Sequence, residues 1–144
     1  MENNDTIQLL KECDSGTKMA VASIDEVSEK ISNPQLKQLL QKSKEKHTLL
    51  GNELHSLLLE YGSEEKDPDP MAKGMSWIKT NMKMTMDGTD AAAADLITDG
   101  CNMGIKSLYK YLNKYPSANR IAKDILSRII AIEDSLRKDL RVYL

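Results

Sequence analysis

The sequence contains no phenylalanine, one tryptophan and five tyrosines, so aromatic residues make up only 4% of the chain. A buried core must therefore be built from leucine, isoleucine and methionine, with a few tyrosines. Two cysteines are too few for the disulfide framework of a small secreted domain. A chain of 144 residues is nevertheless long enough to bury a sizeable core, so folding alone requires neither a disulfide nor a metal ion.

Other absences narrow the range of functions. No apolar run approaches the length of about 20 residues that a membrane-spanning helix needs. The first six residues, MENNDT, are polar and acidic, unlike a secretory signal. The 20 basic and 22 acidic residues are mixed along the whole chain, so no concentration of positive charge would attract nucleic acid or an anionic membrane. We therefore expect a cytoplasmic protein without nucleic-acid or membrane partners.

Strand signals are also missing, whereas helical periodicity is strong. Apolar residues recur at spacings of three and four, which is the period of an amphipathic helix. No alternation of apolar and polar residues is sustained long enough to predict a strand. The sequence therefore predicts an all-α protein. Its long helical segments are residues 5–31, 34–61, 91–115 and 117–144.

Prolines and glycines divide these helices into two pairs. Asn33 and Pro34 suit the cap and first turn of a helix, and Gly62 suits a left-handed C-cap. A short connection between long helices predicts an antiparallel hairpin. Residues 63–70, SEEKDPDP, break any regular element, and residues 71–82 then show a shorter amphipathic pattern. We expect one domain, 1–144, in which hairpin one (5–61) and hairpin two (89–144) are joined by a long crossover (62–88) containing a short helix.

The second predicted helix carries one histidine on its apolar face. Counting four and three residues in turn from the first leucine gives a continuous core-facing seam. The seam consists of Leu36, Leu40, Ser43, His47, Leu50, Leu54, Leu57 and Tyr61. A histidine halfway along such a seam is either a ligand or a core residue hydrogen-bonded to a carboxylate or hydroxyl.

A short motif recurs in the first helix of each hairpin. Residues 13–18, CDSGTK, and residues 101–106, CNMGIK, both read Cys-x-x-Gly-x-Lys. Each motif helix leads to a proline, Pro34 or Pro116, that opens its partner. The repeat favours two copies of one helix pair related by a pseudo-twofold axis. The alternative is that small residues recur simply where helices approach closely.

With this motif and a tryptophan-containing crossover, the chain resembles the ferritin-like superfamily. Within it, the resemblance is to uncharacterised small bacterial families, domains of unknown function with degenerate di-iron motifs. The resemblance runs from Leu9 to Leu140 and implies a four-helix bundle of two antiparallel hairpins. Active members of the superfamily hold two irons with one Glu from each of two helices and a Glu-x-x-His motif from each of the other two.

The ligands that this resemblance requires are missing. Lys44 stands three residues before His47, where a glutamate is needed, and Leu136 follows Glu133 where a histidine is needed. Gly16 stands where the single glutamate of the first helix is expected. Because two irons need several carboxylates to balance their charge, we expect no normal di-iron site and no resident cofactor.

A divergent metal site is the alternative. Polar residues near the seams of four helices are candidates to bind one iron or zinc ion with mixed donors. The positive charge of Lys44 would oppose a cation there, which favours His47 as a hydrogen-bonded core residue. Cys13 and Cys101 are expected to be packed thiols, although the repeat could bring them face to face as a redox pair. The candidate metal ligands are His47, Asp14, Asp99, Cys101 and Glu133.

Methionines are concentrated in the crossover around Trp77. We expect one face of this segment to pack on the bundle or, alternatively, to contact a second copy or another protein partner. The spacing Met82-x-Met84-x-Met86 also resembles a thioether ligand set for copper(I). The candidate interaction surface consists of Met71, Met75, Trp77, Ile78 and Met82.

The pattern as a whole gives little support to catalysis, because it contains no phosphate-binding loop and no plausible nucleophile with its base. The sequence therefore predicts a non-catalytic ferritin-like bundle that acts as a small intracellular interaction or structural protein, with a homodimer as one form of that interaction. The alternative is a metal-binding protein or metalloenzyme that uses His47 with nearby carboxylates or Cys101.

Overall fold

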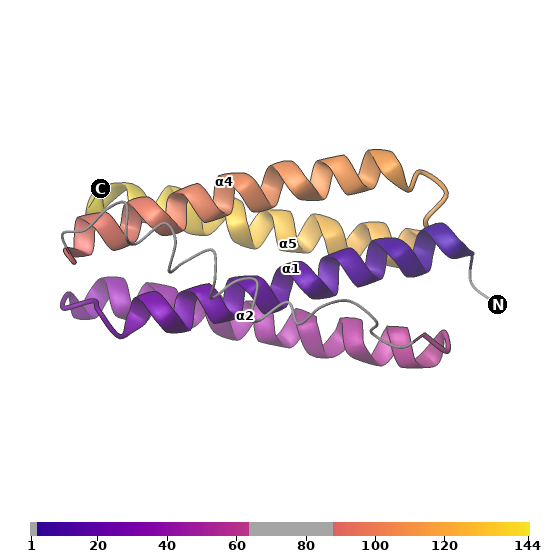
Figure 1. The fold of residues 1–144 in the computed structure, drawn as a ribbon, viewed down its shortest axis with the longest axis horizontal. Helices are drawn as coiled ribbons and strands as arrows, with labels where there is room; N and C mark the ends of the chain where they lie inside the picture. Colours follow the sequence, from indigo (N-terminus) through magenta and orange to yellow (C-terminus); the bar gives the residue numbers. More distant parts are fainter. Residues whose placement is uncertain (1–2, 64–87) are drawn as a thin grey trace.

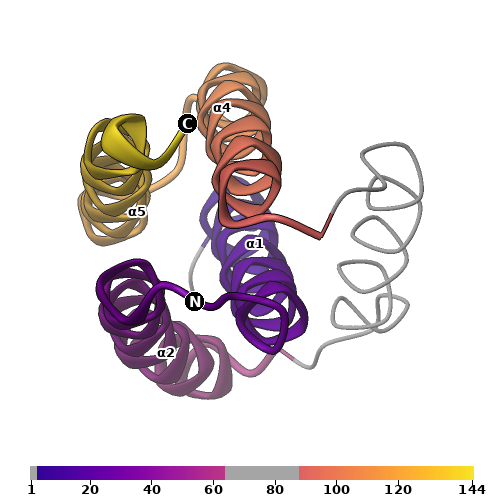
Figure 2. The same ribbon diagram turned by 90° about the vertical axis from the view of Figure 1, so that its left-hand side faces the viewer.

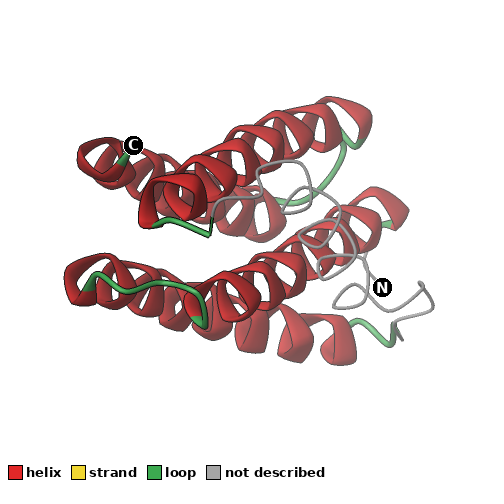
Figure 3. Ribbon diagram, turned by 60° about the vertical axis from the view of Figure 1, so that its left-hand side comes forward, coloured by secondary structure: helices red, strands yellow, loops and turns green. Residues whose placement is uncertain are grey.

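The computed structural model of the chain describes residues 3–63 and 88–144. These residues contain helices and no strand, so the all-α prediction is confirmed for them. None of their helices is long and apolar enough to cross a membrane. Figure 3 shows that short loops join the helices within each pair. The elements are α1 (Asn4–Ser28), α2 (Pro34–Glu60), α4 (Asp90–Lys114), α5 (Arg120–Asp139) and the short 3-10 helix η1 (Leu140–Tyr143).

Asparagine side chains begin the second helix of each pair. Asn33 caps α2 by accepting backbone N–H groups of its first turn, and Pro34 occupies that turn as predicted. Asn119 caps α5 in the same way. The last helix therefore begins at residue 120, and the predicted start at residue 117 is wrong because the asparagine, not the proline, sets the boundary.

The C-terminal ends of α1 and α2 differ in how well they were predicted. α1 ends at Ser28, whereas the apolar pattern continues to Ile31, because Ile31 is buried from the connecting loop and not from the helix. Gly62 follows α2 with a φ of 71°, which is the left-handed conformation predicted for it.

The helices form two antiparallel pairs, α1 with α2 and α4 with α5 (Figure 1). In the end-on view of Figure 2, α1 lies between α2 and α4, and α5 occupies the remaining corner. α4 packs on α1, α5 packs on α2, and α1 also contacts α5 across the middle of the bundle. The described chain leaves α2 at residue 63 and resumes at residue 88 before α4, at the opposite end of the bundle.

An aspartate at the start of the first helix in each pair binds the loop of the other pair. The Asp90 carboxylate accepts the backbone N–H groups of Ser32 at 2.8 Å and Asn33 at 3.0 Å. At the other end of the bundle, the Asp5 carboxylate accepts the backbone N–H of Ser117 at 3.0 Å. Both ends are thus fastened in the same way, which agrees with the pseudo-twofold relation that the repeat predicts.

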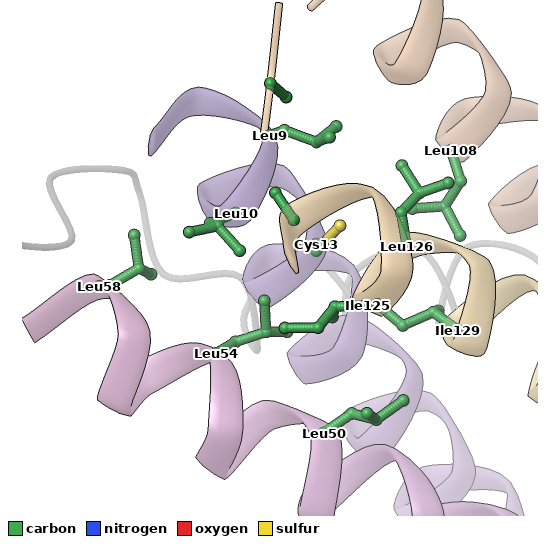
Figure 4. Close-up of a cluster of buried hydrophobic side chains, with 12 residues drawn as sticks. Leu9, Leu10, Cys13, Leu50, Leu54, Leu58, Leu108, Ile125, Leu126 and Ile129 are labelled. Atoms are coloured by element: carbon green, nitrogen blue, oxygen red, sulfur yellow. The ribbon is translucent and has the colours of Figure 1, made fainter. Parts of the chain in front are cut away.

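The aliphatic core consists of two clusters, one toward each end of the bundle. Figure 4 shows the first cluster, in which leucine and isoleucine side chains of all four long helices point toward one another. Its buried members are Leu9, Leu10, Cys13, Leu50, Leu54, Leu58, Leu108, Ala118, Ala122, Ile125, Leu126 and Ile129. The second cluster consists of Ile24, Val27, Ile31, Leu36, Leu40, Ala94, Leu96, Ile97, Cys101, Leu136 and Leu140.

The predicted crossover helix, residues 71–82, lies outside the described residues. The same holds for its candidate interaction surface of Met71, Met75, Trp77, Ile78 and Met82, and for the copper-like methionine spacing.

Candidate functional site

A layer of buried polar side chains separates the two aliphatic clusters. Asp14 and Thr17 come from α1, Ser43 and His47 from α2, and Glu133 from α5. On each of these helices, the buried residues before the layer belong to one cluster and those after it to the other. Buried polar groups need hydrogen-bond partners, so the layer is where chemistry or a specific polar network must be sought.

His47 joins α2 to α5 within this layer. Its Nε2 lies 2.7 Å from Oε1 of Glu133, and its Nδ1 lies 2.8 Å from the carbonyl oxygen of Ser43. Because a carbonyl oxygen can only accept a hydrogen bond, Nδ1 must carry a proton and donate a hydrogen bond to the Ser43 carbonyl oxygen. The second ring proton therefore lies between Nε2 and the Glu133 carboxylate. This geometry matches the interpretation of His47 as a hydrogen-bonded core residue.

The surroundings of His47 favour its protonated form. Burial lowers the pKa of His47, but the hydrogen bond and negative charge of Glu133, together with the Ser43 carbonyl, outweigh burial and raise the pKa above the ordinary 6.5. The side chain of His47 is 1% exposed and that of Glu133 is 10% exposed, so water screens their attraction only weakly. At pH 6.5 and below, the His47 side chain is therefore mainly an imidazolium.

Helix α4 borders the same carboxylate with a thiol and a glycine. Burial, followed by the negative charge and hydrogen bonding of Glu133, raises the pKa of the Cys101 thiol far above its ordinary value. A Cβ atom built on Gly104 would lie 3.8 Å from the carboxyl carbon of Glu133, which is an ordinary contact distance. Side chains from α2, α4 and α5 therefore meet at Glu133.

The structure brings together three of the five predicted metal ligands, namely His47, Cys101 and Glu133. Asp14 is buried in the same layer, where its carboxylate pairs with the Lys18 ammonium at 3.0 Å. Within residues 3–63 and 88–144, no three histidine, cysteine, aspartate or glutamate side chains are arranged to hold a metal ion as they stand. A metal ion would therefore have to displace the existing hydrogen bonds of the layer.

Two residues do not lie where the sequence predicted. Asp99 is exposed, so its place near the core is wrong: it is two residues from both Ile97 and Cys101, which amounts to about 200° of helix rotation. Lys44 was expected beside His47, but its Nζ binds the half-exposed Asp25 carboxylate at 2.6 Å. The Lys44 ammonium group therefore pairs with Asp25 at the α1–α2 surface and does not face the polar layer.

The two cysteines are free and buried in different clusters, so the face-to-face redox pair is not formed. Burial and the negative charges of Glu12 and Asp14 raise the pKa of the Cys13 thiol to about 12. A thiol that stays protonated at neutral pH is a poor nucleophile. Cys13 and Cys101 are therefore packed thiols, as predicted.

Sequence reasoning named His47 and Glu133 separately but missed that they are partners. Each lies fourteen residues after an asparagine N-cap, Asn33 for His47 and Asn119 for Glu133. The pseudo-twofold relation consequently places them at equivalent depths on the neighbouring helices α2 and α5. Counting from the caps, and not from the Cys-x-x-Gly motif, would have indicated the pair.

A cavity of about 360 Å³ lies between α1 and α4 and extends inward to the pair. His47 and Glu133 form part of its lining, and Cys101 and Gly104 line it from α4. The remaining walls are mainly aliphatic. The polar layer is thus reached from one side of the bundle by an open space.

Comparison with known proteins identifies the family of the chain. No curated protein and no solved structure matches it. Residues 5–114 match a family described as Domain of unknown function (DUF2383). This region contains α1, α2 and α4, with His47 and Cys101, and ends before Glu133. Because the match covers well over half of the 144 residues, the protein belongs to the DUF2383 family.

Proposed function

We propose that this protein is a non-catalytic ferritin-like bundle that serves as a small intracellular interaction or structural protein. The observation that carries the proposal is the 2.7 Å contact between His47 and Glu133 in the middle of the bundle. Metal ligands of a ferritin-like bundle project into the core from facing helices, and here His47 of α2 and Glu133 of α5 project into the core and contact each other. A buried ion pair can select one packing arrangement of the helices.

The order and direction of the helices support the ferritin-like part of the proposal. Each helix pair is antiparallel, and the described chain breaks off at residue 63 and resumes at residue 88 at opposite ends of the bundle. A bundle of two hairpins with one long crossover requires this arrangement. The free, buried thiols of Cys13 and Cys101 suit a reducing, cytoplasmic environment.

Metal analysis of the purified protein tests the non-catalytic role. The protein is expressed with iron and zinc in the medium, and its metal content is measured before and after addition of each ion. We expect the purified protein to contain far less than one metal ion per chain, and we expect added iron or zinc to leave its melting temperature unchanged. One or two tightly held ions per chain would refute it.

The interaction role needs a separate test because the candidate surface, residues 71–82, lies outside the described residues. We expect light scattering to show self-association, or a pull-down to recover a protein partner, and we expect the double variant Trp77→Ser/Ile78→Ser to abolish it. Leu59→Ser is the matched control, since Leu59 is 60% exposed on α2. A strict monomer at high concentration that recovers no partner would contradict this role.

A second candidate function is binding of a single zinc ion, and a specific observation favours it. Nδ1 of His47 donates to a backbone carbonyl, which is how metal-ligating histidines are commonly oriented. Nε2 then faces Glu133, and the Cys101 thiol lies beside the same carboxylate. Stoichiometric zinc uptake that is lost in both His47→Gln and Cys101→Ala would establish this function. Uptake that survives both substitutions would assign the metal to another place.

A further inference from the structure

The cavity between α1 and α4 has no part in a purely structural role. Its volume of about 360 Å³ lies within the range of small-molecule sites and far exceeds the water-sized voids of a packed interior. Gly16 and Met103 in its lining are exposed, so the cavity reaches solvent. A Cβ atom built on Gly16 would meet no atom within 4 Å, which shows that the space in front of this glycine is empty.

The cavity is elongated along the two helices. Its lining runs from Glu12 to Ile24 on α1 and from Tyr111 to Ile97 on the antiparallel α4. Twelve residues of helix rise about 18 Å, so the lining extends over about that length along the two helices. A mainly apolar space of this length can accommodate an extended hydrocarbon chain.

The charges in the lining favour a cationic ligand. Among the described residues, the charged groups that line the cavity are Glu12, Glu133 and His47, and no lysine or arginine joins them. His47 and Glu133 neutralise each other through their 2.7 Å contact, which leaves the Glu12 carboxylate as the net charge. Glu12 lies at one end of the channel near Tyr111, and burial together with the negative charge of Glu12 raises the pKa of the Tyr111 hydroxyl.

We propose that this cavity binds a single-chain amphiphile with a protonated amine head. The ammonium group donates hydrogen bonds to the Glu12 carboxylate beside Tyr111, and the alkyl chain lies between α1 and α4, past the buried pair and toward Ile97. A fatty acid of the same length would place its carboxylate against that of Glu12 and is therefore excluded by charge. This binding activity goes beyond the proposed structural role and does not depend on it.

Titration calorimetry with dodecylammonium, kept below its micelle-forming concentration, tests the proposal. We expect saturable binding of one molecule per chain and a higher melting temperature in its presence. Butylammonium tests the length of the channel, and dodecanoate tests the charge; each should bind at least about tenfold more weakly. Absence of saturable dodecylammonium binding, or equal binding of dodecanoate, would overturn the proposal.

Two substitutions locate the site without touching the buried core. Glu12→Gln keeps the shape of the side chain and should weaken dodecylammonium binding about tenfold, whereas Glu45→Gln, the same change on the exposed face of α2, should not. Gly16→Leu places a side chain at the cavity mouth and should block binding. Gly16→Ala gives the same gain in helix propensity with little filling and should leave binding intact. Unchanged binding in both Glu12→Gln and Gly16→Leu would refute the assignment.

Discussion

The stability contributed by the buried His47–Glu133 pair should depend on pH in a direction that the structure fixes. The folded-state pKa of His47 lies above 6.5, so the protonated histidine contributes its full stabilisation below pH 6.5 and loses it as pH rises through the folded-state pKa. Glu133→Gln removes the negative charge but keeps a side chain of the same length that can still hydrogen-bond to Nε2. The variant should therefore be destabilised most at acidic pH.

The magnitude follows from the cost of keeping a histidine neutral. In Glu133→Gln, burial favours neutral His47 in the folded state, while the unfolded chain still protonates near pH 6.5. One pH unit below that value, this difference amounts to about 1.4 kcal/mol, before adding what the wild-type pair gains from its charge. A loss of about 1.5–2 kcal/mol at pH 5.5 should lower the melting temperature by roughly 4–8 °C for a chain of this size.

Urea denaturation followed by circular dichroism at 222 nm, between pH 5.5 and 8.5, measures the effect. The difference in unfolding free energy between wild type and Glu133→Gln should fall as pH rises. His55→Gln, which changes the exposed histidine of α2, is the matched control. A difference that stays constant across this pH range would refute the reasoning. The double variant His47→Leu/Glu133→Leu should be as stable as wild type or more stable, because a buried ion pair can be replaced by apolar packing.

Other consequences of the structure can be measured directly. Cys13 and Cys101 should not react with a thiol reagent in the native protein at pH 7.5 and should react fully after unfolding; rapid native labelling would contradict their burial. Asp90→Ala removes two hydrogen bonds to the α1–α2 loop and should lower the unfolding free energy by about 1–2 kcal/mol; no change would mean that the fastening is not formed in solution. Leu54→Ala should lower the unfolding free energy by about 2–5 kcal/mol, whereas Leu59→Ala, on the exposed face of the same helix, should change it by less than about 0.5 kcal/mol.

The fold was largely predictable because the helices carry strong amphipathic periodicity, and the failures have physical causes. On α2 the predicted seam is buried as far as Leu54, but Leu58 is then buried in place of Leu57, and Tyr61 is only half-buried. Counting four and three in turn assumes 3.5 residues per turn, whereas a straight helix has 3.6, so the seam drifts by about 20° per heptad. After three heptads the core lies nearer the next residue.

The candidate site was predictable in its members but not in its contacts. Periodicity identified His47 as a core-facing histidine, and Glu133 was named only as one of the candidate metal ligands. Periodicity could not show which helix faces which, because this depends on contacts between residues far apart in sequence, such as the loop hydrogen bonds of Asp90 and Asp5. Asp99 was kept among the candidates although the period of its own helix already places it about 200° from Ile97 and Cys101. The cavity is a property of how α1 and α4 are spaced, and no local pattern reports that spacing.

The three fastening points, one at each end of the bundle and one in its middle, together fix the register between the two helix pairs. Leucine and isoleucine layers alone tolerate sliding, because one aliphatic layer resembles the next. A slip of one helical turn, about 5.4 Å, would break the Asp90 and Asp5 hydrogen bonds together and would separate His47 from Glu133. The few charged and polar contacts therefore select one axial register of the two helix pairs out of those that aliphatic packing would allow.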